Sequence, residues 1–178
     1  MKLFIASDIH GSAYYANLMV ERFHSEKADR MILLGDVLYH GPRNDLPREY
    51  NPKAVIAMLN TLKDKILCVK GNCESEVDSM VLDFNVESNF MTILTENVAI
   101  CATHGHRVNP PLCGCDILLC GHTHVPALEE RDGYYYVNPG STSIPKESSP
   151  HSYMTFDGKT LRWFDINTVE CYKEFTLK

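Results

Sequence analysis

Apolar residues gather in five short runs along the chain, and each run is continuous rather than alternating. The runs are LFIAS from Leu3, MILLG from Met31, ILCVK from Ile66, VAICAT from Val98 and DILLC from Asp116. Continuous runs of this length, rich in β-branched residues, are typical of strands that are covered on both faces. The pattern therefore predicts a layered α/β protein.

Helical periodicity occupies the stretches between the first four runs. Residues 12–26 carry apolar side chains at helical spacing, and residues 51–62 begin with Asn51 at the cap and Pro52 at the first helical position. A third, shorter helix is predicted over residues 75–84. Strands that alternate with helices are the units of crossover connections, so these runs are expected to share a sheet.

The last third of the chain has a different pattern, with alternating residues and turn signals. Two hairpins, each turning at an Asp-Gly pair, and one half-exposed strand are predicted at residues 127–137, 152–166 and 168–178. We expect them to form a largely antiparallel second sheet. Because no linker, repeat or low-complexity segment interrupts the chain, residues 1–178 are predicted to fold as a single domain.

Composition places the chain among ordinary globular proteins. Apolar residues make up 44% and charged residues 22%, and 17 basic against 23 acidic residues give a net charge of −6. The acidic residues are scattered, whereas tracking along a nucleic-acid polymer needs a basic stripe, so such a partner is not expected. No apolar stretch approaches the roughly 18 residues of a membrane span, and the first residues do not form a signal peptide. We therefore expect a cytoplasmic protein without a membrane partner.

The seven cysteines are odd in number, and several lie inside apolar runs. In a cytoplasmic protein such cysteines are typically reduced and buried in the core. A structural zinc site at Cys113 and Cys115 would need a second pair at a matching spacing, which the sequence lacks.

Every apolar run ends in a polar cluster, usually with glycine beside it. The clusters are SDIHG, LGDVLYHG, KGNCE, ATHGH and CGHTH. Ligands of open α/β sheets bind outside the carboxyl ends of the strands, so these clusters are expected to converge. Asp8 and His10 are two residues apart, as are His122 and His124, and in extended backbone each pair would share one side of the chain.

The clusters together offer carboxylate, imidazole and amide groups, which suit Mn²⁺, Zn²⁺ or Fe²⁺. Taken singly, such a histidine is more often a hydrogen-bonded surface residue, a lone aspartate a helix cap and a lone asparagine a turn former. Five of the eight histidines, however, follow strand runs, and eight candidate donors are too many for one tetrahedral ion. A site for two metals is the economical interpretation of Asp8, His10, Asp36, Asn72, His104, His106, His122 and His124.

The motifs DIHG, GDVLYHG, GNCE, THGH and GHTH stand in an order and spacing that resembles the calcineurin-like metallophosphoesterases. GNCESEVD, HGPRN and NPGSTSIPK resemble in particular the small bacterial phosphodiesterases of the YfcE type. The resemblance implies a four-layer α/β/β/α sandwich with a mixed first sheet and a largely antiparallel second sheet. It also implies hydrolysis of a phosphodiester by attack of a metal-bound hydroxide.

The resemblance further implies a role for each donor. Asp36 would bridge two divalent ions, with Mn²⁺ favoured and Zn²⁺ or Fe²⁺ as alternatives. One ion would be held by Asp8, His10 and His124, and the other by Asn72, His104 and His122. Replacing the bridge would then damage both metal positions at once.

The chain departs from the family pattern at one position. Cys73 stands where the wider family has a histidine that serves as acid for the leaving group, and a thiol is a poor substitute for imidazole. Cys73 either acts in catalysis or only packs beside the site. The predicted catalytic set is Asp36, Asn72, Cys73 and His106, and the predicted substrate contacts are Arg43, Asn44 and His106.

The expected activity is therefore that of a metal-dependent phosphodiesterase with a small phosphodiester substrate and a preference for acidic leaving groups. Two other functions stay open: a phosphomonoesterase or phosphoprotein phosphatase, and a non-catalytic metal-binding scaffold, since the fold also serves as a scaffold. A homo-oligomer is a further possibility for which no residue can be named.

Overall fold

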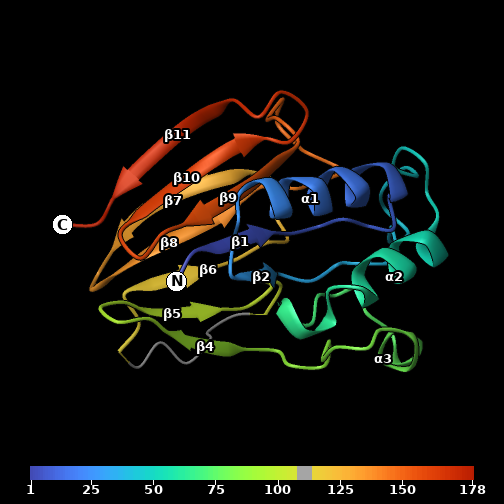
Figure 1. Ribbon diagram of the computed structural model, residues 1–178, viewed down its shortest axis with the longest axis horizontal. Coiled ribbons are helices and arrows are strands. Elements are labelled where there is room, and N and C mark those ends of the chain that lie inside the picture. Colours follow the sequence, from blue (N-terminus) through green and yellow to red (C-terminus); the bar gives the residue numbers. More distant parts are fainter. Residues whose placement is uncertain (108–113) are drawn as a thin grey trace.

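Two β-sheets packed face to face, with helices beside them, form the framework of the protein (Figure 1). The computed structural model describes residues 1–107 and 114–178. The six-stranded sheet has the spatial order β11 (Cys171–Thr176), β10 (Thr160–Asp165), β9 (Ser152–Phe156), β1 (Leu3–Ala6), β2 (Arg30–Leu33) and β3 (Ile66–Cys68). The five-stranded sheet has the order β4 (Met91–Leu94), β5 (Ala99–Ala102), β6 (Ile117–Leu119), β8 (Tyr134–Pro139) and β7 (Pro126–Arg131).

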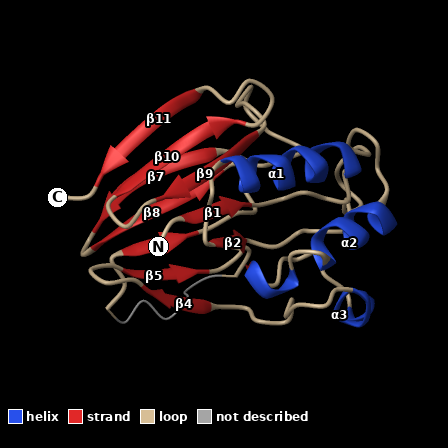
Figure 2. Ribbon diagram, in the orientation of Figure 1, coloured by secondary structure: helices blue, strands red, loops and turns tan. Residues whose placement is uncertain are grey.

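All three predicted helices form, and their ends have the expected caps. They are α1 (Ala13–Ser25), α2 (Pro52–Asn60) and α3 (Glu76–Val81), and a short 3₁₀ helix, η1 (Lys63–Lys65), precedes β3. The Ser12 side chain accepts the N–H of Tyr15, and Asn51 caps α2 by accepting the N–H of Ala54. Figure 2 shows the helices grouped together on one side of the strands.

The core lies in two main layers on either side of the six-stranded sheet. Side chains of α1 and α2 pack with those of β1, β2 and β3 in the first layer. In the second layer, β1, β2, β9 and β10 face β5, β6 and β8, and the indole N–H of Trp163 donates to the Asn138 carbonyl across the two sheets. This packing fixes the two sets of strand ends relative to each other, which the site requires.

Both sheets are mixed, so the expectation of a largely antiparallel second sheet needs correction. Strands β5, β6 and β8 run parallel, whereas β4 and β7 are antiparallel to their neighbours. The two C-terminal hairpin patterns do form, but they divide between the sheets: β7 and β8 extend β6, and β9, β10 and β11 extend β1. Hairpin signals fix local pairing and do not fix which sheet a hairpin joins. Among the described residues no helix covers the outer face of the five-stranded sheet, where a small cluster of cysteine and aromatic side chains lies.

Two of the cysteines lie next to each other. Parallel pairing of β5 and β6 brings Cys101 beside Cys115 with Cα atoms 5.9 Å apart, a separation that a disulfide can span. Cys68 and Cys120 are buried free thiols, as expected. Cys113, named above with a zinc site, lies outside the described residues. No helix in the described part of the chain is long and apolar enough to cross a bilayer.

Candidate metal centre

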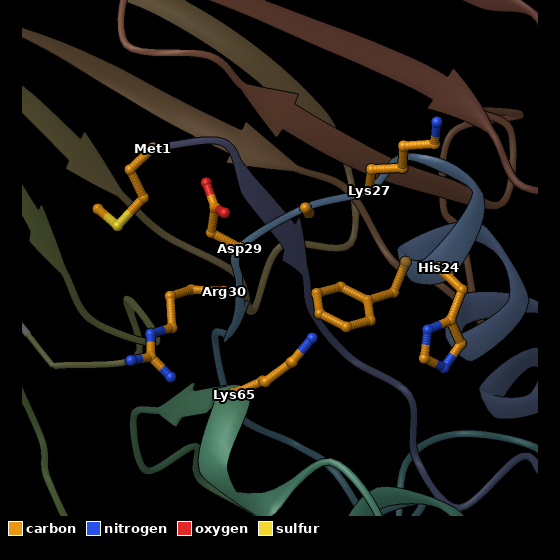
Figure 3. A pocket seen from close by; sticks show the side chains of 8 residues that line it. Met1, His24, Lys27, Asp29, Arg30 and Lys65 are labelled. Carbon is orange, nitrogen blue, oxygen red and sulfur yellow. The ribbon is translucent and has the colours of Figure 1, made fainter.

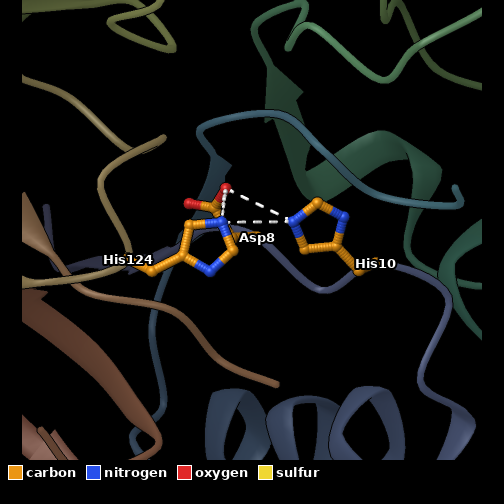
Figure 4. A group of neighbouring side chains, drawn as sticks. All are labelled: Asp8, His10 and His124. Carbon is orange, nitrogen blue, oxygen red and sulfur yellow. Dashed lines mark hydrogen bonds and ion pairs between the residues drawn. The ribbon is translucent and has the colours of Figure 1, made fainter. Parts of the chain in front are cut away.

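The loops that follow β1, β2, β3, β5 and β6 meet at one place, as the strand-end clusters predict. Figure 4 shows the side chains of Asp8, His10 and His124 turned toward one another. Asp8 Oδ1 lies 3.2 Å from His124 Nε2 and 3.6 Å from His10 Nε2, and the two Nε2 atoms are 3.4 Å apart. All three residues are buried. Three donors that face one small volume away from solvent form a site for a cation.

Asp36 connects this group to a second one. Its Oδ2 lies 3.6 Å from His10 Nε2 and 3.4 Å from His104 Nε2, so the carboxylate stands between the two imidazoles. Asn72 Oδ1 lies 3.1 Å from His104 Nε2. Overlapping groups of possible ligands are Asp8 with His10 and His124, Asp8 with Asp36 and His104, and His10 with Asp36 and Cys73. Asp8, His10 and Asp36 each belong to two of these groups, and Asp36 lies between His10 and His104; its role as a bridge stays a prediction.

Backbone carbonyls orient the three imidazoles. The Nδ1 atoms of His10, His104 and His124 lie 2.7, 2.6 and 2.5 Å from the carbonyl oxygens of residues 39, 34 and 144. A carbonyl only accepts, so in the neutral ring each Nδ1 carries the hydrogen and each Nε2 keeps a free lone pair toward the site. Asp8 Oδ1 is buried and has no hydrogen-bond partner. An unpaired carboxylate oxygen among lone pairs of this kind fits a divalent cation.

His122 and His106 lie beside His104, but neither belongs to the groups of possible ligands named above. The His122 ring centroid is 5.1 Å from that of His104, and its backbone N–H donates to Asp8 Oδ2 over 3.0 Å. The His106 ring centroid is 5.4 Å from that of His104, and its buried Nδ1 has no partner among the described residues. The structure thus brings both histidines to the site, and their roles as ligand and substrate contact stay predictions.

The pairs Asp8–His10 and His122–His124 share a side of the chain, but not through extended backbone as predicted. Asp8, His10, His122 and His124 have φ between 49° and 67°, and Asp36 has φ 55°. This left-handed region is costly for residues other than glycine and is concentrated at functional sites. Sharp left-handed turns at the strand ends, rather than the alternation of a strand, present these side chains to one point.

Close approach of the β2 and β3 loops explains two of the glycines. A Cβ on Gly71 would collide with the Asp36 carboxylate, and a Cβ on Gly35 would lie 2.6 Å from the Gly71 nitrogen and 3.0 Å from His104 Nδ1. Only hydrogen fits in these two places. The glycines therefore allow the Asp36 loop, the Asn72 loop and the His104 ring to share one small volume.

Glu74, which the sequence analysis does not single out, holds these two loops together. Its buried carboxylate accepts the N–H of Val37 over 2.6 Å, the N–H of Asp36 over 3.0 Å and the N–H of Gly71. Burial and the nearby Asp36 carboxylate raise the pKa of Glu74. An acidic residue directly after the Gly-Asn-Cys motif was visible in the sequence, but its contact with the β2 loop was not.

Glu74→Gln should destabilise the protein and weaken its affinity for Mn²⁺. The substitution places an NH₂ group against backbone N–H donors, which costs about 1–3 kcal/mol because buried donors lose their acceptor. Chemical unfolding of the metal-free protein measures the first effect and titration calorimetry with Mn²⁺ the second. Glu130→Gln, on the exposed face of β7, is the matched control. A loss of stability with unchanged Mn²⁺ affinity would show that Glu74 serves the fold alone.

The segment NPGSTS (residues 138–143), which ends β8 and begins the loop after it, holds the turns of the site in place. Ser141 Oγ and Ser143 Oγ donate to the Asp8 carbonyl over 2.8 and 3.1 Å, and the Asn138 amide donates to the Gly121 carbonyl over 2.8 Å. These bonds hold the left-handed turns that carry Asp8 and the two histidines around Thr123. The loop has a positioning role that its sequence alone did not reveal.

Charges in the metal-free site are strongly coupled. Burial alone would raise the pKa values of Asp8 and Asp36, but the imidazoles that face them, His10 and His124 at Asp8 and His104 at Asp36, lower both. Burial would lower the pKa of His104, yet its bond to Asp36 and the charge of Asp8 raise it to about 9. Burial and the charge of His104 lower the pKa of His122 and of His106. Without metal, a protonated His104 therefore pairs with the Asp36 carboxylate.

Mn²⁺ affinity should rise with pH between about 7 and 9. A pKa raised from 6.5 to about 9 means that protonated His104 stabilises the metal-free protein fully below pH 6.5, and that this stabilisation is lost as pH rises through 9. A metal ion needs the neutral imidazole, so binding must release that proton, and affinity should gain about tenfold per pH unit in this range. Calorimetry in two buffers of different ionisation enthalpy measures the released proton. A Mn²⁺ affinity that does not change with pH would contradict the pairing of protonated His104 with Asp36.

A pocket of 430 Å³ opens above the donors. Its lining consists of Asp36, Arg43, Asn44, Asn72, His122, Thr123, His124 and Lys146. Arg43 and Asn44, predicted as substrate contacts, thus face the same space as four of the predicted metal ligands. Asn44 also donates its amide to the His40 carbonyl over 2.7 Å, which fixes the loop that carries Arg43. Thr123 and Lys146 are lining residues that the sequence analysis missed.

A larger hollow of 790 Å³ lies at the other ends of β2 and β3, near the first residue of the chain (Figure 3). Lys27, Arg30 and Lys65 line it, together with the exposed His24 and Asp29. The Arg30 guanidinium already donates to the Asp64 carbonyl. None of the predicted site residues reaches this hollow, so the chemistry belongs to the smaller pocket.

Comparisons with known proteins show which family and which relatives the chain resembles. Residues 1–161 match the family model of the calcineurin-like phosphoesterase superfamily domain. The chain is 43% identical over 171 residues to the phosphodiesterase YfcE of Escherichia coli K12, covering 94% of this chain and 93% of that protein. It is 25% identical over 178 residues to the probable metallophosphoesterase YsnB of Bacillus subtilis, covering 93% and 91%.

Solved structures show the same fold. The structure of the E. coli phosphoesterase YfcE superposes with a TM-score of 0.93 at 39% identity and covers 100% of both chains. Wild-type Vps29 of Entamoeba histolytica, solved as a complex with Zn²⁺, superposes with a TM-score of 0.68 at 21% identity and covers 99% of both chains. The second match supports the fold alone.

Proposed function

Because the chain belongs to the calcineurin-like phosphoesterase superfamily, a family of metal-dependent hydrolases, we propose that it hydrolyses small phosphodiesters with two divalent metal ions. The observation that supports this most is the position of Asp36 between His10 and His104, with Asp8, His124 and Asn72 at either end. A complete set of donors of this kind fits catalysis better than a scaffold.

Each donor has a defined task in the proposal. Asp36 bridges the two ions, because its two oxygens can reach two cations and its charge reduces their repulsion. Two groups of donors hold the ions on either side of it: Asp8, His10 and His124, and Asn72, His104 and His122. Mn²⁺ is the proposed metal, since oxygen and imidazole ligands suit it. Ions held by these donors would supply an activated water and positive charge at the attacking and leaving oxygens of the phosphodiester.

The chain's own residues orient the substrate and exclude water from the donors. Arg43 and Asn44, which line the pocket, would contact an anionic group of the substrate, and His106 lies beside the second group of donors. Burial of Asp8, His10 and His104 strengthens every charge interaction there. In this proposal the two metal ions, together with Arg43 and Lys146, supply the positive charge that attracts an anionic substrate to a protein of net charge −6.

Turnover of a diester against a monoester tests this function. Metal-stripped protein should leave bis(p-nitrophenyl) phosphate intact, and added Mn²⁺ should start its hydrolysis at a rate above that for p-nitrophenyl phosphate. A monoester carries one more negative charge on the reacting phosphate and needs more positive contacts there than a diester does. Faster turnover of the monoester would favour a phosphatase, and Mn²⁺ binding without turnover would favour a scaffold. A cytoplasmic location and a homo-oligomeric state remain proposals from the sequence.

A further inference from the structure

The pocket above the donors is larger and more cationic than one phosphodiester group requires. Its 430 Å³ falls in the range of small-molecule sites, and its floor consists of the candidate metal ligands. The walls contain Arg43, Asn44, Thr123 and Lys146, all polar or charged. Among the described residues, no aliphatic side chain and no Phe, Tyr or Trp lines this pocket. A lipid chain or an aromatic ring on the substrate would therefore find no matching surface there.

The two cations of the wall are free to bind a ligand. Arg131 and Arg162 form ion pairs with acidic neighbours, whereas neither Arg43 nor Lys146 has a carboxylate partner or a side-chain hydrogen bond within the described residues. Both are exposed to solvent through the pocket mouth. Cations without partners over a site of this kind attract an anion.

Both cations stand on segments that are tied to the site. Lys146 donates its backbone N–H to the His124 carbonyl over 3.3 Å, and Ser149 Oγ donates to the Lys146 carbonyl over 2.7 Å. Arg43 lies in the loop that Asn44 closes on His40. The two positive charges thus reach the pocket from different loops, one after β2 and one after β8.

We propose that Arg43 and Lys146 form a second anion subsite, which selects phosphodiesters whose non-leaving arm carries a further phosphate, phosphonate or carboxylate group. This inference rests on the proposed function and narrows its substrate class. A simple phosphodiester has a single negative charge, which the metal positions already face. Arg43 and Lys146 add two positive charges beyond the metal positions, and a second anionic group on the non-leaving arm of the substrate would match them.

Three p-nitrophenyl phosphodiesters with the same leaving group test the subsite. Their second arms are 2-phosphonoethyl, which is anionic, 3,3-dimethylbutyl, which is neutral, and choline, its cationic isostere. With Mn²⁺-loaded protein, kcat/KM should decrease in that order. The ratio of kcat/KM for the anionic over the neutral arm should fall about tenfold in Arg43→Gln with Lys146→Gln, mainly through KM. Lys53→Gln with Lys159→Gln, two exposed lysines away from the pocket, controls for the same change of two in net charge.

The outcomes separate the subsite from the proposed function. Hydrolysis of all three esters with equal kcat/KM, or an order that survives in the double variant, overturns the subsite and leaves the phosphodiesterase activity standing. If no ester is hydrolysed, the proposed activity fails. The esters then remain intact and can be studied as ligands by calorimetry. Binding that weakens from the anionic to the neutral to the cationic arm, with this order lost in the double variant, would still support the subsite. Equal Kd values would overturn it.

Discussion

Asp36→Asn should lower the Mn²⁺-dependent hydrolysis of bis(p-nitrophenyl) phosphate by roughly 10³-fold, because it removes the one charge that both groups of donors share. Asp36 Oδ2 faces His10 Nε2 at 3.6 Å and His104 Nε2 at 3.4 Å. Asparagine keeps the shape and one oxygen, so the Cys73 N–H can retain its bond to this side chain. Steady-state kinetics and the number of Mn²⁺ ions bound per chain measure the effect.

The control for this variant is Asp45→Asn, an exposed aspartate in the loop after β2. It changes the net charge by the same amount without touching the donors and should leave both readouts unchanged. A folded Asp36→Asn protein that still binds two Mn²⁺ ions and keeps its kcat would contradict the bridging role.

Cys73→His should raise kcat/KM for phosphodiesters with alkyl leaving groups by about 10²-fold and change p-nitrophenyl substrates far less. Burial and the Asp36 carboxylate raise the pKa of the Cys73 thiol, so it holds its proton too tightly to serve a leaving alkoxide. The thiol lies at the site, since the Asn72 amide donates to its sulfur over 3.2 Å. An imidazole at this position is a better acid. A series of aryl and alkyl esters measures the dependence on leaving-group pKa.

Cys171→His, at an exposed cysteine of β11, is the matched control and should not affect any ester. If Cys73→His raised all esters by the same factor, the position would affect binding or metal affinity rather than proton transfer. If it had no effect on any of them, Cys73 would only pack beside the site.

Much of the framework could be predicted from the sequence, because the apolar runs and caps act locally. The continuous runs became β1, β2, β3, β5 and β6, and the predicted helices begin at their capping residues. Strand β4 was missed, since it is a four-residue edge strand in which only Ile93 is buried, too short for its apolar residues to stand out. Hairpin signals found the C-terminal strands but could not assign them to a sheet, because that depends on packing of both faces.

The donors of the site could also be predicted, because each follows a strand and strand ends converge. Their geometry could not. Positive φ angles at Asp8, Asp36 and His124 depend on bonds from distant residues, such as Ser141 and Glu74, that hold the turns. Those supporting side chains are separated from the donors by as many as 133 positions, and a sequence pattern does not reveal such contacts.

The Mn²⁺ dependence of activity, followed ion by ion, tests the central claim most directly. Metal-stripped protein is titrated with Mn²⁺ while bound metal and hydrolysis of bis(p-nitrophenyl) phosphate are measured on the same samples. If Asp36 bridges two ions, we expect no hydrolysis without metal and a rate of hydrolysis that reaches its plateau at two Mn²⁺ ions per chain. Protein that holds two ions and leaves the diester intact, or that reaches full activity with one, would contradict it.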